Sequence, residues 1–72
     1  MLRNKIQQFR GLHGLSRDDL GKAVGLTRQT IHLIETDPGY MPSAETMVRL
    51  ANYFNCDLGR LFYIERSPVG EK

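Results

Sequence analysis

The sequence contains few of the residues that small proteins use as covalent or metal staples. Its 72 residues include one cysteine, three prolines and no tryptophan. A single cysteine excludes an internal disulfide framework, and no cluster of Cys and His has the spacing of a zinc site. A domain of this size buries only about 60% of the surface of its unfolded chain. We therefore expect marginal stability without a metal or other cofactor, and dimerisation as a source of further burial.

Long apolar runs and catalytic constellations are also missing. The first residues, MLRNKIQ, mix apolar with charged and polar side chains, so they lack the apolar core of a signal peptide or a membrane span. No set of Ser, His and carboxylate residues has the spacing of an assembled catalytic site. We expect a cytoplasmic protein without enzymatic activity, membrane partner or small-molecule effector.

The charge is small in total but unevenly distributed. The net charge is +2. Residues 1–34 carry six basic and two acidic side chains, whereas residues 35–72 carry four basic and six acidic ones. A basic half suits an approach to phosphate, although chance asymmetry of this size also occurs in small domains.

Residues 16–35, SRDDLGKAVGLTRQTIHLIE, predict two short capped helices joined by a glycine turn. Ser16 with Asp19 has the spacing of a capping box, and Thr27 is placed to cap the second helix. Gly25 lies between them, where glycine can adopt the left-handed conformation that ends a helix. This outline is typical of a DNA-reading helix-turn-helix.

Three further helices are predicted around this pair. Apolar residues from Leu2 onward recur at helical intervals, with Leu12 or His13 completing the stripe before Gly14. Ser43 is placed to cap a helix that runs to about Asn55, and Asp57 to open a fifth in the same manner. Further inward-facing residues are expected on the second, fourth and fifth helices: Leu20, Ala23, Val24; Met47, Leu50, Ala51, Phe54; Leu58, Leu61, Phe62. Cys56 is expected to be a small buried apolar residue.

We therefore expect an all-α domain over residues 1–64 and a short C-terminal tail over 65–72. No strand pair joined by a hairpin turn is visible in the sequence. Tyr63 and Ile64 either close the core or form a dimer contact, and the two interpretations are equally favoured.

The outward face of the helix near residues 28–35 suits a major groove. Ile31 and Ile34 fall on one inward stripe at 100° per residue. The opposite face presents four candidate base-reading residues: Arg28, Gln29, His32 and Leu33. Arginine can bond bidentately to guanine, glutamine to adenine, and an apolar side chain can touch a thymine methyl. On an isolated helix such a face would more often be only solvated, but the surrounding helical signals favour recognition.

Residues near the starts of the two helices are candidates for contacts to the DNA backbone. Ser16 and Thr27 are helix caps first, and phosphate contact would be an added role for both. Arg17, at the start of its helix, is either a surface charge or a phosphate contact, and we favour the second.

The segment LSRDDLGKAVGLTRQTIHLIE, then Pro42-Ser43 and a closing LxxLF, resembles the Cro and phage-repressor (XRE-like) helix-turn-helix family. The resemblance covers roughly residues 3–63. It implies a compact five-helix, lambda-repressor-like domain, with its second and third helices forming the helix-turn-helix, that binds operator DNA as a homodimer. It adds Thr36 and Tyr40 as backbone contacts.

The resemblance also implies a structural pair between Arg10 and Glu35, which is either buried or a loose surface pair. Three positions depart from the family pattern. Gly21 stands where alanine is usual, Arg17 replaces a frequent glutamine, and the loop TDPGYM is one residue longer than the commonest version.

The sequence therefore predicts a cytoplasmic, sequence-specific transcriptional regulator that acts as a homodimer on double-stranded DNA. It represses or activates by occupying a promoter, and we favour a repressor. The alternative is a protein-interaction module of the same fold, similar to an antitoxin or a coactivator.

Overall fold

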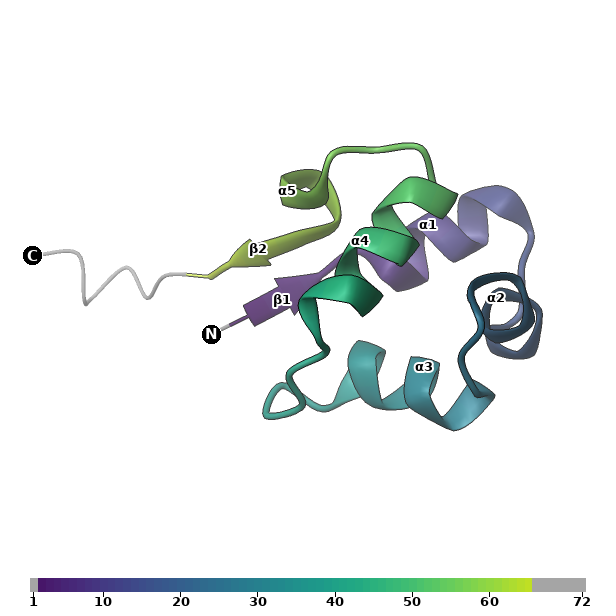
Figure 1. Ribbon diagram of the computed structural model, residues 1–72, viewed down its shortest axis with the longest axis horizontal. Coiled ribbons are helices and arrows are strands. Elements are labelled where there is room, and N and C mark those ends of the chain that lie inside the picture. Colours follow the sequence, from purple (N-terminus) through teal and green to yellow (C-terminus); the bar gives the residue numbers. More distant parts are fainter. Residues whose placement is uncertain (1, 66–72) are drawn as a thin grey trace, which may run out of the picture.

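The computed structural model describes residues 2–65 and contains five helices and a two-stranded sheet (Figure 1). Four helices have at least eight residues: α1 (Ile6–His13), α2 (Arg17–Val24), α3 (Arg28–Thr36) and α4 (Ala44–Tyr53). The fifth, α5 (Leu58–Leu61), is a single turn. Strands β1 (Leu2–Asn4) and β2 (Phe62–Ile64) pair with each other. Residues 66–72 of the predicted tail lie outside the described part.

The helix-turn-helix forms as its local signals predict. The Ser16 hydroxyl accepts a hydrogen bond from the backbone N–H of Asp19, and the Asp19 carboxylate accepts one from that of Ser16. Thr27 and Ser43 cap α3 and α4 in the same way, through the amides three residues later. Gly25 ends α2 with a φ of 76°, in the left-handed region that glycine enters without steric cost. The side chains at the starts of α2, α3 and α4 therefore satisfy free amides of their first turns.

All five helices and β2 contribute to one hydrophobic core. Its ten buried members are Ile6, Leu20, Val24, Ile31, Ile34, Leu50, Ala51, Phe54, Leu61 and Phe62. The rings of Phe9 and His13 each lie with their centroids 5.3 Å from that of Phe54. Leu12 and His13 are both exposed, and His13 meets the core only through its ring contact with Phe54. Cys56 is partly buried against the core.

The sheet is the main departure from the predicted all-helical chain. Leu2, Arg3 and Asn4 pair antiparallel with Ile64, Tyr63 and Phe62, respectively. The first helix therefore begins at Ile6 and not at Leu2. The two strands lie about sixty residues apart in the sequence, so no hairpin-turn signal could predict their pairing. Figure 1 shows this ribbon at one end of the molecule, with α3 and α5 on opposite sides of the helical body.

Other predicted features are wrong near the C-terminus and on α2. Asp57 makes no side-chain cap bond to α5. Leu58 is 42% exposed and not inward-facing, whereas Phe62 is buried as predicted, although it lies in a strand and not in the fifth helix. The fourth helix ends at Tyr53, two residues early, and Asn55 follows with a φ of 54°. Ala23 is exposed, because only Leu20, Gly21 and Val24 of α2 face inward.

Candidate nucleic-acid interface

Helix α3 presents its polar face to solvent. Ile31 and Ile34 are buried, as the helical spacing predicts. Arg28, Gln29 and His32 are exposed, and within residues 2–65 no hydrogen bond engages their side chains. Leu33 is half-buried, so it offers only part of its side chain to a ligand. The donors and acceptors of three of the four predicted base-reading residues are available.

Five of the nine predicted contact residues gather around one shallow recess. It is lined by Arg17 from α2, the cap Thr27, and three residues of α3, namely Arg28, Gln29 and His32. A second recess beside it is lined by Arg10, Ser16, Arg17, Asp18 and Arg28. Arg17 and Arg28 border both. The first turns of α2 and α3 therefore form one continuous surface with basic side chains along it.

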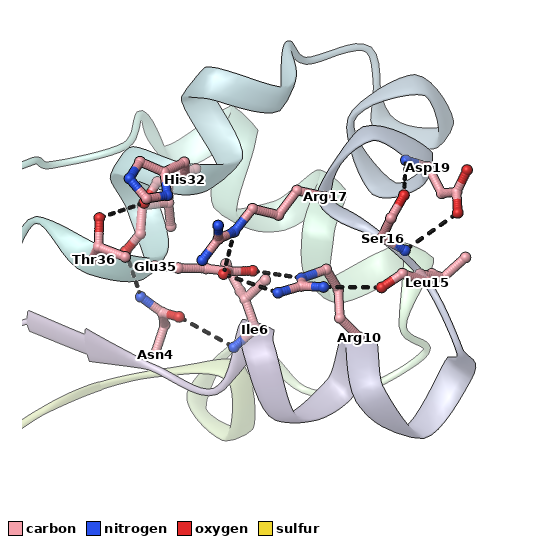
Figure 2. Close-up of polar contacts among 11 residues, drawn as sticks. Asn4, Ile6, Arg10, Leu15, Ser16, Arg17, Asp19, His32, Glu35 and Thr36 are labelled. Carbon is pink, nitrogen blue, oxygen red and sulfur yellow. Dashed lines mark hydrogen bonds and ion pairs between the residues drawn. The ribbon is translucent and has the colours of Figure 1, made fainter.

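A buried ion-pair network lies directly behind this surface. Figure 2 shows Glu35 of α3 between the guanidinium groups of Arg10 and Arg17. Arg10 donates from Nε to Oε2 (2.7 Å) and from Nη2 to Oε1 (3.1 Å) of Glu35. Its Nη1 donates to the carbonyl of Leu15 (2.9 Å). The Glu35 side chain is 1% exposed and that of Arg10 is 15% exposed, so the carboxylate is buried and the pair is not a loose surface contact.

The hydrogen bond to Glu35 is the main reason that the pKa of Arg10 is raised above its ordinary value, against a smaller lowering by burial. A buried carboxylate needs such donors, because desolvation without them is costly. Arg10 therefore joins α1 and the segment before α2 to the last turn of α3.

Arg17 has a contact that the sequence did not predict. Its Nε donates to Oε1 of Glu35 at 3.0 Å. The carboxylate thus accepts three N–H bonds from two arginines. A long side chain at position 17 can reach residue 35 because the crossing of α2 and α3 brings the two residues together, and no sequence pattern reports that crossing.

The two contacts that were taken from the family resemblance lie toward the far end of α3. The Thr36 hydroxyl donates to the carbonyl of His32 at 2.7 Å (Figure 2), so it is partly engaged within the helix. Tyr40 is half-buried against the core. Asp37 organises the loop between them, since its Oδ1 accepts the N–H of Gly39.

Two residues that sequence reasoning missed bind the C-terminal ends of the two helices of the helix-turn-helix. The Asn4 amide donates to the carbonyl of Ile34 at 2.8 Å, and its Oδ1 accepts the N–H of Ile6 at 3.1 Å (Figure 2). Asn4 thereby joins β1, α1 and the end of α3. Arg49 of α4 reaches the carbonyl of Val24 at the end of α2. Asn before a helix is a known capping signal, whereas nothing local marks Arg49.

The described residues offer little sign of other site types. Within residues 2–65, no group of three or more His, Cys, Asp or Glu residues is placed to hold a metal ion. In the same range, no helix combines the length and apolar character needed to cross a membrane.

A capped helix, a glycine turn and a second helix with an exposed polar face define a helix-turn-helix domain. Residues 6–61 match the helix-turn-helix family model. An uncharacterised HTH-type transcriptional regulator of Methanocaldococcus jannaschii is 36% identical over 64 residues, which cover 89% of this chain and 96% of the relative. The uncharacterised regulator YgzD of Bacillus subtilis is 33% identical over the same shares.

An uncharacterised HTH-type regulator of Archaeoglobus fulgidus is 33% identical over 71 residues, covering 99% of this chain and the whole of the relative. The chain therefore belongs to the helix-turn-helix family of transcriptional regulators.

Proposed function

We propose that this protein is a sequence-specific repressor that acts as a cytoplasmic homodimer, with α3 in the major groove of operator DNA. The observation that carries the proposal is the recess where Arg17, Thr27, Arg28, Gln29 and His32 meet. A helix with free polar side chains on its first turns can contact base edges, while the start of the preceding helix meets the backbone.

Each residue of this surface has a chemically suited role in the proposal. Arg28 bonds guanine and Gln29 bonds adenine, both bidentately, while the exposed edge of Leu33 meets a thymine methyl. His32 reads a base through a ring nitrogen. The phosphate contacts are Ser16, Arg17, Thr27, Thr36 and Tyr40. These contacts position the protein without carrying sequence information.

The edge of β2 supports the homodimer. The Lys5 N–H donates to the carbonyl of Leu61 at 2.9 Å. In an antiparallel ladder, hydrogen-bonded residue pairs alternate with pairs that are not hydrogen-bonded. Arg3 and Tyr63 are then the next hydrogen-bonded pair, and the backbone groups of Ile64 face away from β1. Ile64 is 65% exposed and Tyr63 is 38% exposed, so neither closes the core. Pairing of β2 with β2 of a second copy would use an open edge and cover both side chains.

In vitro selection of bound duplexes from a random pool tests the function. We expect a preferred sequence with two half-sites about 10 bp apart, as a two-fold dimer on one face of DNA requires. Affinity for that sequence should fall steeply with added salt. Equal affinity for random and selected duplexes would contradict sequence-specific binding. A protein partner that stays bound after Arg28→Ala and Gln29→Ala would instead favour the interaction module.

Sedimentation equilibrium tests the homodimer. The wild-type protein should have twice the monomer mass, and Ile64→Lys should lower the dimer affinity by placing a charge at the strand edge. Leu12→Lys is the matched control, since Leu12 is 82% exposed near the far end of α1. A wild-type protein that stays monomeric at high concentration would contradict the proposal.

A further inference from the structure

Arg17 uses only one of its N–H groups to bind Glu35. The bond runs from Nε to Oε1 at 3.0 Å, and the side chain remains 28% exposed. Within residues 2–65, neither terminal amino group of Arg17 makes a hydrogen bond. Because a guanidinium has five N–H donors in a fixed fork, Arg17 can bond Glu35 and still offer N–H groups to another ligand.

The bond between Arg17 and Glu35 is placed where it can restrain the tilt of α3 relative to α2. The Gly25 turn joins the end of α2 to the start of α3. Arg17 is the first residue of α2 and Glu35 is the eighth residue of α3. The two therefore join the ends of the helices that lie farthest from the turn, about 10 Å along α3 from its first residue at 1.5 Å per residue. A link at that distance restrains the tilt of α3 more than the turn alone does.

The charges show that Arg17 is not needed merely to neutralise Glu35. Arg10 already supplies a bidentate partner to the carboxylate. Adding Arg17 gives the three groups a net positive charge, next to the recess lined by Ser16, Asp18 and Arg28 as well. That excess charge faces the surface where the proposed function puts a DNA phosphate, and charge-assisted bonds to phosphate are strong.

We infer that Arg17 is a positioning residue for α3: through Glu35 it fixes the tilt of the reading helix, and with its remaining N–H groups it couples that tilt to a backbone phosphate. This inference rests on the proposed function, because a phosphate and a read base are required for its second half. A simple phosphate contact would affect all DNA sequences alike. A positioning residue also affects the discrimination between sequences, because hydrogen bonds to bases weaken steeply with misalignment.

The first experiment is hydrogen exchange on the free protein. Arg17→Gln removes the charged donor, and Lys22→Gln is the matched control, since Lys22 is also on α2 but pairs with exposed Asp18. The exchange rates of the amides in the last turn of α3 are divided by those of the amides in α4, which serve as the internal reference. We expect this ratio to be about 5-fold higher in Arg17→Gln than in the wild type, the effect of one lost hydrogen bond. The ratio in Lys22→Gln should match the wild type. An unchanged ratio in Arg17→Gln would overturn the positioning role.

The second experiment measures DNA binding by Arg17→Lys, using a selected duplex and a random duplex. Lysine keeps the charge but lacks the planar fork, so the slope of affinity against salt should stay unchanged. The ratio of specific to non-specific affinity should fall about 2- to 30-fold. This is the range for residues that modulate a binding contact made by other residues. A wild-type ratio in Arg17→Lys would overturn the coupling. If the wild type itself shows no sequence preference, the proposed function fails while the exchange result still decides the positioning role.

Discussion

Gly21 of α2 lies directly against the carbonyl of Leu26 in the turn before α3. A Cβ on Gly21 would be 2.6 Å from the Leu26 oxygen and 3.2 Å from the Thr27 carbonyl carbon. Both neighbours are backbone atoms, which cannot move aside as a flexible side chain could. The turn is also held to Gly21 by a 2.7 Å hydrogen bond from Leu26 N–H to the Gly21 carbonyl. Glycine therefore allows α2 and the start of α3 to approach this closely.

Substitution of Gly21 by alanine should destabilise the protein even though alanine is the better helix former. The propensity gain is about 1 kcal/mol, whereas forced overpacking costs about 1 to 3 kcal/mol. Gly11→Ala is the matched control, because Gly11 is also helical and nothing lies within 4 Å of its added Cβ. It should stabilise by about 0.5 to 1 kcal/mol. Urea unfolding measures both, and a more stable Gly21→Ala would contradict the close contact.

Removal of Arg10 should have a large effect on stability. Arg10→Met keeps an apolar stem but removes two of the three N–H bonds to the buried Glu35 carboxylate. Because Arg17 remains as a partner, the cost should approach but not exceed the figure of about 3 to 5 kcal/mol for a fully unpaired buried charge. The control is Arg3→Met, since Arg3 and Glu65 form an ion pair that is half exposed on both sides. Such pairs contribute about 0 to 1 kcal/mol. Equal denaturation midpoints for the two variants would show that the Glu35 network contributes little.

The capping box of α2 should make stability depend on pH in the acid range. The backbone N–H of Ser16, then its hydroxyl, lowers the pKa of Asp19 below 3.8 in the folded protein. The stabilisation is therefore present above the unfolded pKa and lost as the pH falls through the lower folded pKa. Asp19→Asn should remove this pH-dependent part of the stability. Asp18→Asn should retain it, because that variant keeps the capping box between Ser16 and Asp19. Urea unfolding between about pH 2 and 5 tests this, and parallel curves for wild type and Asp19→Asn would refute it.

Base reading by α3 should be visible as a position-specific loss. Arg28→Ala or Gln29→Ala should cost about 1 to 3 kcal/mol at particular base pairs of a selected duplex and flatten the preference there. Arg60→Ala is the control for charge alone, since Arg60 lies on α5, across the molecule from α3 (Figure 1). Fluorescence anisotropy with singly substituted duplexes measures the preference. Uniform weakening over all duplexes in both α3 variants would assign these residues to the backbone instead.

The helix-turn-helix could be predicted because its signals are local. Ser16, Thr27 and Ser43 lie three residues before the amides that they cap, and Gly25 adopts the conformation that its place between two helices demands. The inward stripe of α3 follows from helical spacing alone, as the burial of Ile31 and Ile34 confirms.

The remaining features depend on contacts between distant parts of the chain. The pairing of β1 with β2 turns a predicted helix start into a strand, because a strand needs a partner and that partner lies near residue 63. Leu58 is exposed because α5 lasts only one turn before the chain extends. The Asn4 bond to Ile34 bridges thirty positions, which no local pattern encodes.

The sequence by itself determined the capped helices, the glycine turn and the residue types on the outer face of α3, since caps and helical periodicity act over three or four residues. Only the tertiary structure decided that Arg17 shares Glu35 with Arg10, and that Leu33 lies half inside. The physical reason is that packing at Gly21 and in the core sets the crossing of α2 and α3. That crossing decides which carboxylate lies within hydrogen-bonding distance of Arg17.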